Sequence, residues 1–200
     1  FCNLWAFFCF LRVYTCMETK LFQQKIFKAQ QREAVIGSAL ARHFDSSIRF
    51  NQSNNLGKWD YTLYNSDHGW CYRMEQTDEN TPLCKNGTIF LEQYIHQPGE
   101  QVKGKFLYTR ADRWVHILNP LEKVIIFDVK AIRQMIVAHE SVGALRTTTP
   151  NFTEWRKKHQ SNPVTGVILD VEDIFLQDPK AIEFTFYDLN ITSNQYKLLH

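Results

Sequence analysis

The distribution of apolar and polar residues predicts a helix near the beginning of the chain. From Glu18 to about His43 the chain has no proline and one glycine, and its apolar residues recur mostly at helical spacing between Gln, Lys and Arg. This periodicity is typical of an amphipathic helix, either one long helix or two short ones. Ser46 to Gly57 is polar and rich in asparagine, which predicts a loop.

Strand-length runs of apolar, aromatic and β-branched residues follow, separated by turn residues. The runs are Trp59 to Tyr64, Trp70 to Glu75, Thr88 to Ile95, Arg113 to Leu118, Lys123 to Phe127, Val164 to Asp170 and, as an edge strand, Ile182 to Tyr187. Asn86-Gly87 is a strong hairpin signal just before the third run. The runs are therefore expected to include an antiparallel meander.

Two further helices are expected in the second half of the chain. Asp128 is placed to cap a helix from Val129 to about Ala138, and Phe152 to His159 has the pattern of a short basic helix. The buried side of the first of these helices is expected to carry Ile132, Met135 and Ile136. Together the elements predict a single domain of mixed α/β or α+β class.

The first sixteen residues differ from the rest of the chain. The apolar run from Phe1 to Leu11 is too short to span a bilayer, and it lacks the basic start and the cleavage site of a signal peptide. We interpret residues 1–16 as an extension that is not native, with Met17 as the true start and residues 17–200 as one domain. The alternative is an N-terminus that interacts with membranes, although we expect no stable membrane insertion.

Composition narrows the class of protein only slightly. The chain has 200 residues, 44% hydrophobic, and a net charge of +2, which permits a nucleic-acid partner without arguing for one. The five cysteines are odd in number and form no C-x-x-C pair, so we expect a reducing, cytoplasmic location rather than a disulfide framework. The seven histidines are scattered, which gives a histidine-based metal site little support.

The two predicted strands within residues 57–78 contain the most informative candidate chemistry. Asp60 lies near the end of one predicted strand, and Glu75 and Gln76 lie in the next. Carboxylates on adjacent strands are a common way to hold a divalent cation, since Mg²⁺ prefers oxygen ligands. A bound cation would polarise a phosphodiester and activate water, so the stretch suggests phosphodiester chemistry.

Five motifs in order resemble the PD-(D/E)xK nuclease superfamily, and more narrowly a phage and bacterial branch of it. The motifs are Lys58-Trp59-Asp60, Met74-Glu75-Gln76-Thr77-Asp78, Asn86-Gly87-Thr88-Ile89-Phe90-Leu91-Glu92, Thr109-Arg110-Ala111-Asp112-Arg113-Trp114 and Thr165-Gly166-Val167-Ile168-Leu169-Asp170-Val171-Glu172-Asp173. The resemblance covers roughly residues 20 to 175. It implies a restriction-endonuclease-like core, with a central mixed sheet flanked by helices. It also implies metal-dependent endonuclease activity on DNA with Mg²⁺ or Mn²⁺, in an assembly that can be a homodimer.

The resemblance also implies site residues. It assigns catalysis to Asp60, Glu75, Gln76 and Glu92, and metal binding to Asp60, Glu75, Glu92 and the helix residue Glu33. It assigns nucleic-acid contacts to Lys58, Arg73, Lys105, Thr109, Arg110 and Arg113, and Arg156-Lys157-Lys158-His159 is a second basic cluster. Each of these residues also has a simpler interpretation as an ordinary strand-end, helix-face or surface residue.

The second motif departs from the family pattern. Because strand side chains alternate, placing Gln76 at the family's lysine puts Met74 at the metal-binding carboxylate and turns Glu75 to the opposite face. An amide can still orient a water, whereas a thioether is a poor ligand for Mg²⁺. Either a register slip or bulge turns Glu75 inward, or Asp60 acts with Glu92 alone, or the site is inactive.

Two alternatives to the nuclease hypothesis therefore remain open. One is a catalytically inactive protein of nuclease fold that binds nucleic acid or a protein partner. The other is a small α+β binding module unrelated to nucleases, which large separation of Asp60 from Glu92 would favour.

Overall fold

The fold is described from a computed structural model of the chain. It describes residues 2–53, 58–69, 71–79, 85–97, 99–140, 146–148 and 163–197, with side chains from Gln23 onward except those of 146–148, 195 and 197. The predicted basic helix from Phe152 to His159 lies outside the described residues. These residues form a mixed α/β fold, as predicted.

Two sheets contain the strands. The first has six strands in the order β1-β2-β3-β6-β7-β10, and the second has four in the order β5-β4-β9-β8. In the first sheet the strands are β1 (Ile48–Gln52), β2 (Tyr61–Asn65), β3 (Cys71–Glu79), β6 (Arg113–Leu118), β7 (Lys123–Asp128) and β10 (Ile182–Thr185). In the second they are β4 (Thr88–Gln97), β5 (Glu100–Lys103), β8 (Arg146–Thr148) and β9 (Val164–Asp170). Only the β3–β6 pair is parallel among the pairings described, so the first sheet is mixed.

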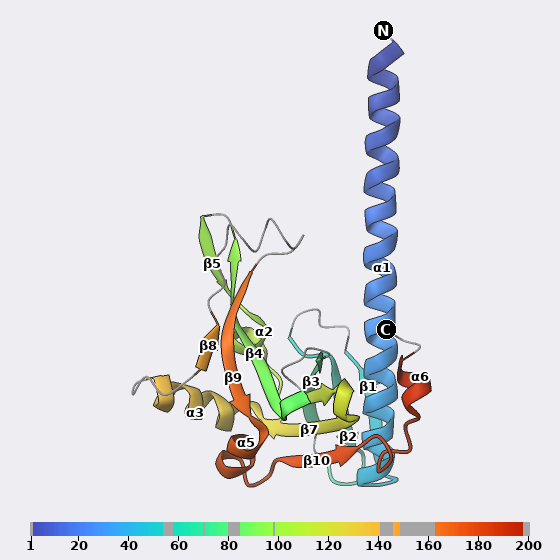
Figure 1. Ribbon diagram of the computed structural model, residues 1–200. Helices are drawn as coiled ribbons and strands as arrows, with labels where there is room; N and C mark the ends of the chain where they lie inside the picture. The colour runs from blue at the N-terminus through green and yellow to red at the C-terminus, as the bar shows by residue number, and fades with distance from the viewer. Residues whose placement is uncertain are drawn as a thin grey trace.

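Helices cover the two sheets unequally. They are α1 (Cys2–Phe44), α2 (Lys105–Tyr108), α3 (Val129–Glu140), α5 (Val171–Gln177) and α6 (Ser193–Lys197), with a 3₁₀ turn, η2, at Asn119–Leu121. Figure 1 shows α1 as a long rod whose C-terminal part lies beside β1 and β2, while its N-terminal part extends away from the sheets. On the other side of the molecule α3 and α5 lie with the second sheet. Among the described residues, no helix combines the length and apolar character needed to cross a membrane.

A separate hydrophobic core lies on each face of the six-stranded sheet. The first core joins α1 and α6 to one face and includes Leu40, Met74 and Val115. The second joins the other face to the second sheet and its helices, and includes Trp114 and Leu91. Because β3 and β6 lie in the middle of the sheet, both faces of these strands are buried.

Most of the predicted elements are confirmed. One long helix, rather than two short ones, covers the N-terminal pattern. The Asp128 carboxylate accepts a hydrogen bond from the Ala131 amide at 2.9 Å, which confirms the N-cap of α3, and Ile132, Met135 and Ile136 are buried as expected. The late strand, β10, lies at the edge of its sheet.

Two predictions about local structure are wrong. The polar segment after α1 is not all loop, because Ile48–Gln52 forms β1, an edge strand in which the polar residues Arg49 and Asn51 are exposed. The strands before and after Asn86-Gly87 do not form a hairpin, because β3 and β4 lie in different sheets. Gly87 does have the positive φ of +70° that an Asn-Gly turn favours, and it directly precedes β4.

Candidate active site

The candidate site lies between the two sheets, where the start of β2 meets the middle of β3. Tyr61 pairs with Met74, so Asp60, one residue earlier, lies opposite Glu75. The Asp60 amide donates to the Met74 carbonyl at 2.9 Å, and its carboxylate accepts a hydrogen bond from the Gln76 amide at 2.7 Å. Strand pairing alone therefore brings together the two carboxylates that the sequence singled out.

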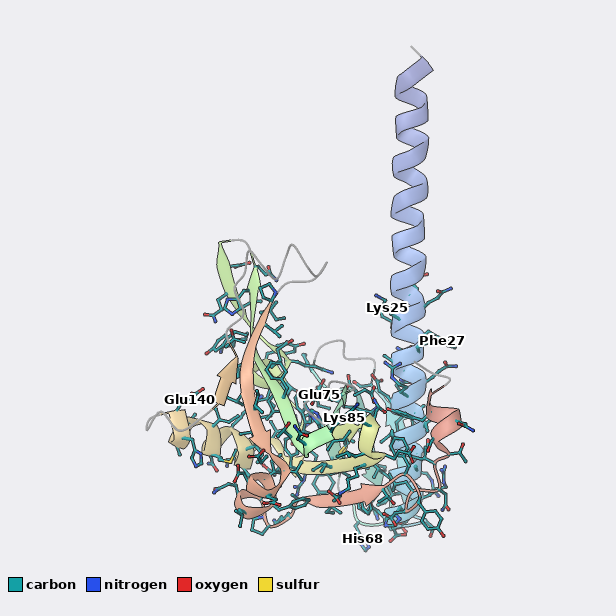
Figure 2. All side chains as sticks on the ribbon, in the orientation of Figure 1. Lys25, Phe27, His68, Glu75, Lys85 and Glu140 are labelled. Atoms are coloured by element: carbon teal, nitrogen blue, oxygen red, sulfur yellow. The ribbon has the colours of Figure 1, made fainter. Side chains whose placement is uncertain are left out.

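Glu75 points into the space between the sheets without any bulge in its strand. The register of β3 against β6 runs continuously from Met74 to Glu79, so the register slip proposed from the sequence is not needed. Met74 belongs to the core on the α1 side, and alternation places Glu75 on the opposite face, beside the core that contains Trp114. In Figure 2 the Glu75 side chain lies near the centre of the molecule.

The lysine of the site comes from α2, an element that the motif pattern does not include. The Lys105 ammonium lies 2.5 Å from the Glu75 carboxylate, 3.3 Å from Asp60 Oδ2 and 3.2 Å from the Gln76 carbonyl oxygen. The sequence interpretation assigned Lys105 to nucleic-acid contact and looked for the site lysine at position 76. The sequence signal that could have pointed to Lys105 is that Gln76 stands at the lysine position of the family motif, so a site lysine must come from another part of the chain.

Thr109 completes the contacts of the Glu75 carboxylate. Its hydroxyl oxygen lies 2.8 Å from Glu75 Oε2 and also 2.9 Å from the Lys58 carbonyl oxygen. Thr109 is buried, and its oxygen accepts a hydrogen bond from the Ala111 amide. The residue that the sequence interpretation placed at the DNA surface is therefore part of the wall of the site.

The short helix α2 is fixed to its surroundings at both ends. At its start, the Gly104 amide donates to the Gln93 carbonyl at 2.6 Å, and the Lys105 amide donates to the Glu92 carboxylate at 3.1 Å. A Cβ at Gly104 would lie 2.7 Å from Glu92 Cγ and 2.9 Å from the Gln93 carbonyl carbon, so this approach to β4 requires glycine. At its end, Arg133 of α3 donates to the carbonyls of Phe106 and Thr109 at 2.5 and 2.9 Å. The sequence interpretation did not find Arg133.

The remaining predicted carboxylates lie beside this cluster. The Glu92 carboxylate accepts a hydrogen bond from the backbone amide of Lys105, and the Asp60 carboxylate accepts one from the Lys105 ammonium group. Glu92 and Asp60 are therefore not far apart. Glu33, on α1, accepts a hydrogen bond from the Gln52 amide at 3.1 Å. Burial and, next, the neighbouring Asp60 carboxylate raise the pKa of Glu33 to about 7.

The Gln76 side chain is separated from the cluster. It alternates with Glu75 and pairs across the sheet with Val115, which belongs to the core on the α1 side. Its amide atoms are buried, and among the described residues they have no hydrogen-bond partner. Only the backbone of Gln76 contacts the candidate site, through its amide to Asp60 and its carbonyl to Lys105.

Two of the four other residues assigned to nucleic-acid contact, Arg73 and Arg113, have side chains held by structural interactions. The Arg73 guanidinium pairs with Asp112 at 2.6 Å and lies over the Trp59 ring. Arg113 lies 3.6 Å from Asp178 and over the ring of Tyr72. The Lys58 and Arg110 side chains are exposed, and their backbones are joined by a hydrogen bond from the Arg110 amide to the Lys58 carbonyl.

The electrostatics of the cluster follow from its burial. Glu75 is 1% exposed, and burial raises its pKa, an effect that the Lys105 charge partly opposes and the Asp60 charge reinforces. Burial by itself would lower the pKa of Lys105, but the Asp60 and Glu75 carboxylates outweigh it and raise that pKa, so the side chain stays protonated. The cluster is thus an ion pair between the buried Glu75 carboxylate and the partly exposed Lys105 ammonium group, with Asp60 as a second carboxylate.

The donor types of this cluster fit a hard divalent cation. Mg²⁺ is commonly held by one or two protein carboxylates together with water and phosphate oxygens, and Asp60 and Glu75 supply two. Within the described ranges, no group of three or more His, Cys, Asp or Glu side chains is arranged to hold a metal ion. A metal here would therefore rely on Asp60 and Glu75, with the remaining ligands from water and substrate.

Comparisons with protein-family models, with curated proteins and with solved structures find no match to this chain. The resemblance to the PD-(D/E)xK superfamily therefore stays a prediction that depends on the motifs and on the geometry of the cluster.

Proposed function

We propose that this protein is a divalent-metal-dependent DNA endonuclease of the PD-(D/E)xK type. The observation that carries the proposal is the contact of one lysine, Lys105, with two carboxylates: Asp60, directly before β2, and Glu75 of the neighbouring strand β3. Carboxylates that hold Mg²⁺ and a cation that stabilises charge on a phosphate are the groups that metal-assisted phosphodiester hydrolysis needs.

Each residue has a separate role in this proposal. Asp60 and Glu75 would hold Mg²⁺ or Mn²⁺, which when bound polarises the scissile phosphate and lowers the pKa of a bound water. Lys105 supplies positive charge next to the carboxylates, where the phosphate must approach. Thr109 orients the Glu75 carboxylate, and Glu92 holds the backbone of Lys105 in place.

The DNA backbone would be contacted mainly by Lys58 and Arg110. Both side chains are exposed, and they are adjacent because the Arg110 amide bonds to the Lys58 carbonyl, which also lies 2.9 Å from the Thr109 hydroxyl. Arg73 and Arg113 are paired with carboxylates, so their charge is already partly neutralised. Phosphate contacts of this kind fix the position of the duplex and weaken with salt.

Cleavage assays with purified protein test the proposal. Supercoiled plasmid and branched DNA are incubated with Mg²⁺ or Mn²⁺, and product formation is compared with that in chelator. We expect cleavage that requires metal, and we expect Asp60→Asn and Glu75→Gln to reduce the rate by about a hundredfold or more. Asp173→Asn, an exposed change on α5, is the matched control and should leave the rate unchanged. Absence of cleavage on every substrate, or full activity of Asp60→Asn, would rule the proposal out.

A second candidate is an inactive protein of nuclease fold that binds nucleic acid. The ion pair of Lys105 with Glu75 favours it, because that pair compensates a buried carboxylate without any metal. Salt-dependent DNA binding that is equal in Mg²⁺ and in chelator, without cleavage, would support this candidate.

A further inference from the structure

We propose that Lys105 is an internal counter-cation of the carboxylate pair, and that a divalent metal ion binds only by displacing the Lys105 ammonium group. The inference rests on the proposed function, because it concerns the metal site formed by Asp60 and Glu75. It adds a property of that site in the metal-free protein: the site is closed by its own lysine.

The contacts of the ammonium group support this inference first. Lys105 Nζ lies 2.5 Å from Glu75 Oε1, 3.3 Å from Asp60 Oδ2 and 3.2 Å from the Gln76 carbonyl oxygen. It therefore lies against the two carboxylates that would ligate a metal. An ammonium group and a divalent cation cannot share one position, since the two positive charges repel each other.

The burial of Glu75 explains why a cation is needed there without metal. Glu75 is 1% exposed, and an ionised carboxylate buried without a partner is strongly unfavourable. Among the described residues, the ion pair of Glu75 is with Lys105 and its side-chain hydrogen bond is with Thr109. Metal binding then replaces the Lys105 ammonium group by the metal ion. The net free energy of metal binding is less favourable, because the attraction between Lys105 and the two carboxylates is lost.

The anchoring of α2 explains how the ammonium group can leave while the helix stays. The backbone of the helix is held by Glu92 at its start and by Arg133 at its end. The Lys105 side chain remains 35% exposed, and its four-carbon stem is flexible. The ammonium group can therefore turn towards solvent, or towards a phosphate, without movement of the backbone.

Calorimetric titration of the metal-free protein with Mn²⁺ at pH 8 tests the inference without any measurement of activity. We expect Lys105→Met to bind Mn²⁺ about tenfold more tightly than the wild type, because the competing cation is gone. Lys103→Met is the matched control, since Lys103 is exposed on β5 and should leave the affinity unchanged. Asp60→Asn should abolish binding, which identifies the site.

Unchanged or weaker binding by Lys105→Met would overturn the inference. Should that variant fail to fold, ¹⁵N NMR of the lysine ammonium groups in the wild type gives the same answer. The ammonium protons of Lys105 should exchange slowly with water in the metal-free protein and faster on saturation with Mg²⁺. An unchanged exchange rate contradicts displacement.

The inference and the nuclease proposal can fail separately. Mn²⁺ binding that depends on Asp60 and tightens in Lys105→Met, without DNA cleavage, supports the inference and rules out the nuclease proposal. DNA cleavage combined with unchanged Mn²⁺ affinity of Lys105→Met does the reverse.

Discussion

At the scale of single residues, the environment of Glu75 decides what the site can do. The carboxylate is buried between two sheets, where its contacts are a lysine from α2 and a buried threonine. Asp60 shares the contact with Lys105 and is also held by the backbone amide of Gln76. The two carboxylates therefore have one partner in common and one partner each, so changes at Thr109 should affect Glu75 and not Asp60.

Replacement of Thr109 by valine should destabilise the protein. Valine keeps the shape of threonine but removes the hydroxyl that lies 2.8 Å from Glu75 Oε2 and accepts from the Ala111 amide. We expect the free energy of unfolding to fall by about 2 kcal/mol, the usual range for a lost bond to a buried charged group. Urea denaturation in chelator measures this effect, with Thr109→Ser as the control that keeps the hydroxyl. Equal stability of the valine and serine variants would contradict the assigned hydrogen bond.

Replacement of Glu33 by glutamine should change the pH dependence of stability. Burial, and then the charge of Asp60, raise the pKa of Glu33 from 4.5 to about 7, so the native state keeps a proton that the unfolded chain releases. The resulting stabilisation is fully present below about pH 4.5 and is lost as pH rises through about 7. Glu33→Gln should therefore gain about 1–2 kcal/mol relative to the wild type between pH 4.5 and pH 8.5, after allowance for partial exposure.

Thermal or urea unfolding at a series of pH values, in chelator, measures the effect of Glu33. Glu172→Gln, an exposed change on α5, is the control and should show the same pH profile as the wild type. A Glu33→Gln profile parallel to that of the wild type would mean that Glu33 titrates as an ordinary exposed carboxylate.

At the scale of elements, the sequence predicts what alternation and helical spacing control. β2, β3, β4, β6, β7 and β9 and the helices α1 and α3 follow directly from these patterns. β1 was missed because an edge strand needs few apolar residues, and its polar residues resemble a loop. The separation of β3 from β4 was missed because a turn signal reports local backbone conformation and not the sheet that the chain enters next.

The candidate site was partly predictable for the same reason. Asp60 and Glu75 were found because one directly precedes a strand and the other lies on the next strand, and alternation places the Glu75 and Met74 side chains on opposite faces of the sheet. The role of Lys105 was not found, because it depends on how α2 packs against β4 and α3. Contacts between elements that are distant in the sequence leave no periodic pattern in either one.

The position of α2 should depend on Arg133. Its guanidinium donates to the carbonyls of Phe106 and Thr109 and lies 5.6 Å from the centre of the Phe106 ring. Arg133→Gln loses most of these bonds, and we expect about 2 kcal/mol lower stability and faster hydrogen exchange at the amides of residues 107–109. Exchange in β9 should not change. Lys130→Gln, an exposed change on the same helix, is the control, and equal exchange of α2 in both variants would show that Arg133 does not hold it.

At the scale of the whole molecule, the two cores divide the protein into a side that holds α1 and a side that holds the site. The first core packs α1 against β1 and β2, and it also contains Met74 of β3, the neighbour of Glu75. The second core contains Phe106 of α2, the neighbour of Lys105. The strands of the six-stranded sheet therefore connect the packing of the long helix to the geometry of the site (Figure 1).

The contact between α1 and β1 can be tested with a double-mutant cycle at Gly37 and Phe50. A Cβ at Gly37 would lie 2.3 and 2.4 Å from two ring carbons of Phe50 and 3.0 Å from one of Tyr61, so this helix position needs glycine only because of its neighbours. We expect Gly37→Ala to lower the free energy of unfolding by about 2 kcal/mol, although alanine favours the helix. In a Phe50→Ala background the same change should be nearly neutral, because the ring that causes the overlap is gone. Urea denaturation of the four proteins gives the coupling energy, expected at about 2 kcal/mol.

Ser38→Ala, at the next position of the helix, is the control and should show little coupling to Phe50. Additive effects of Gly37→Ala and Phe50→Ala would mean that α1 does not pack on β1 at this point, and that the long helix is held by other contacts of the first core.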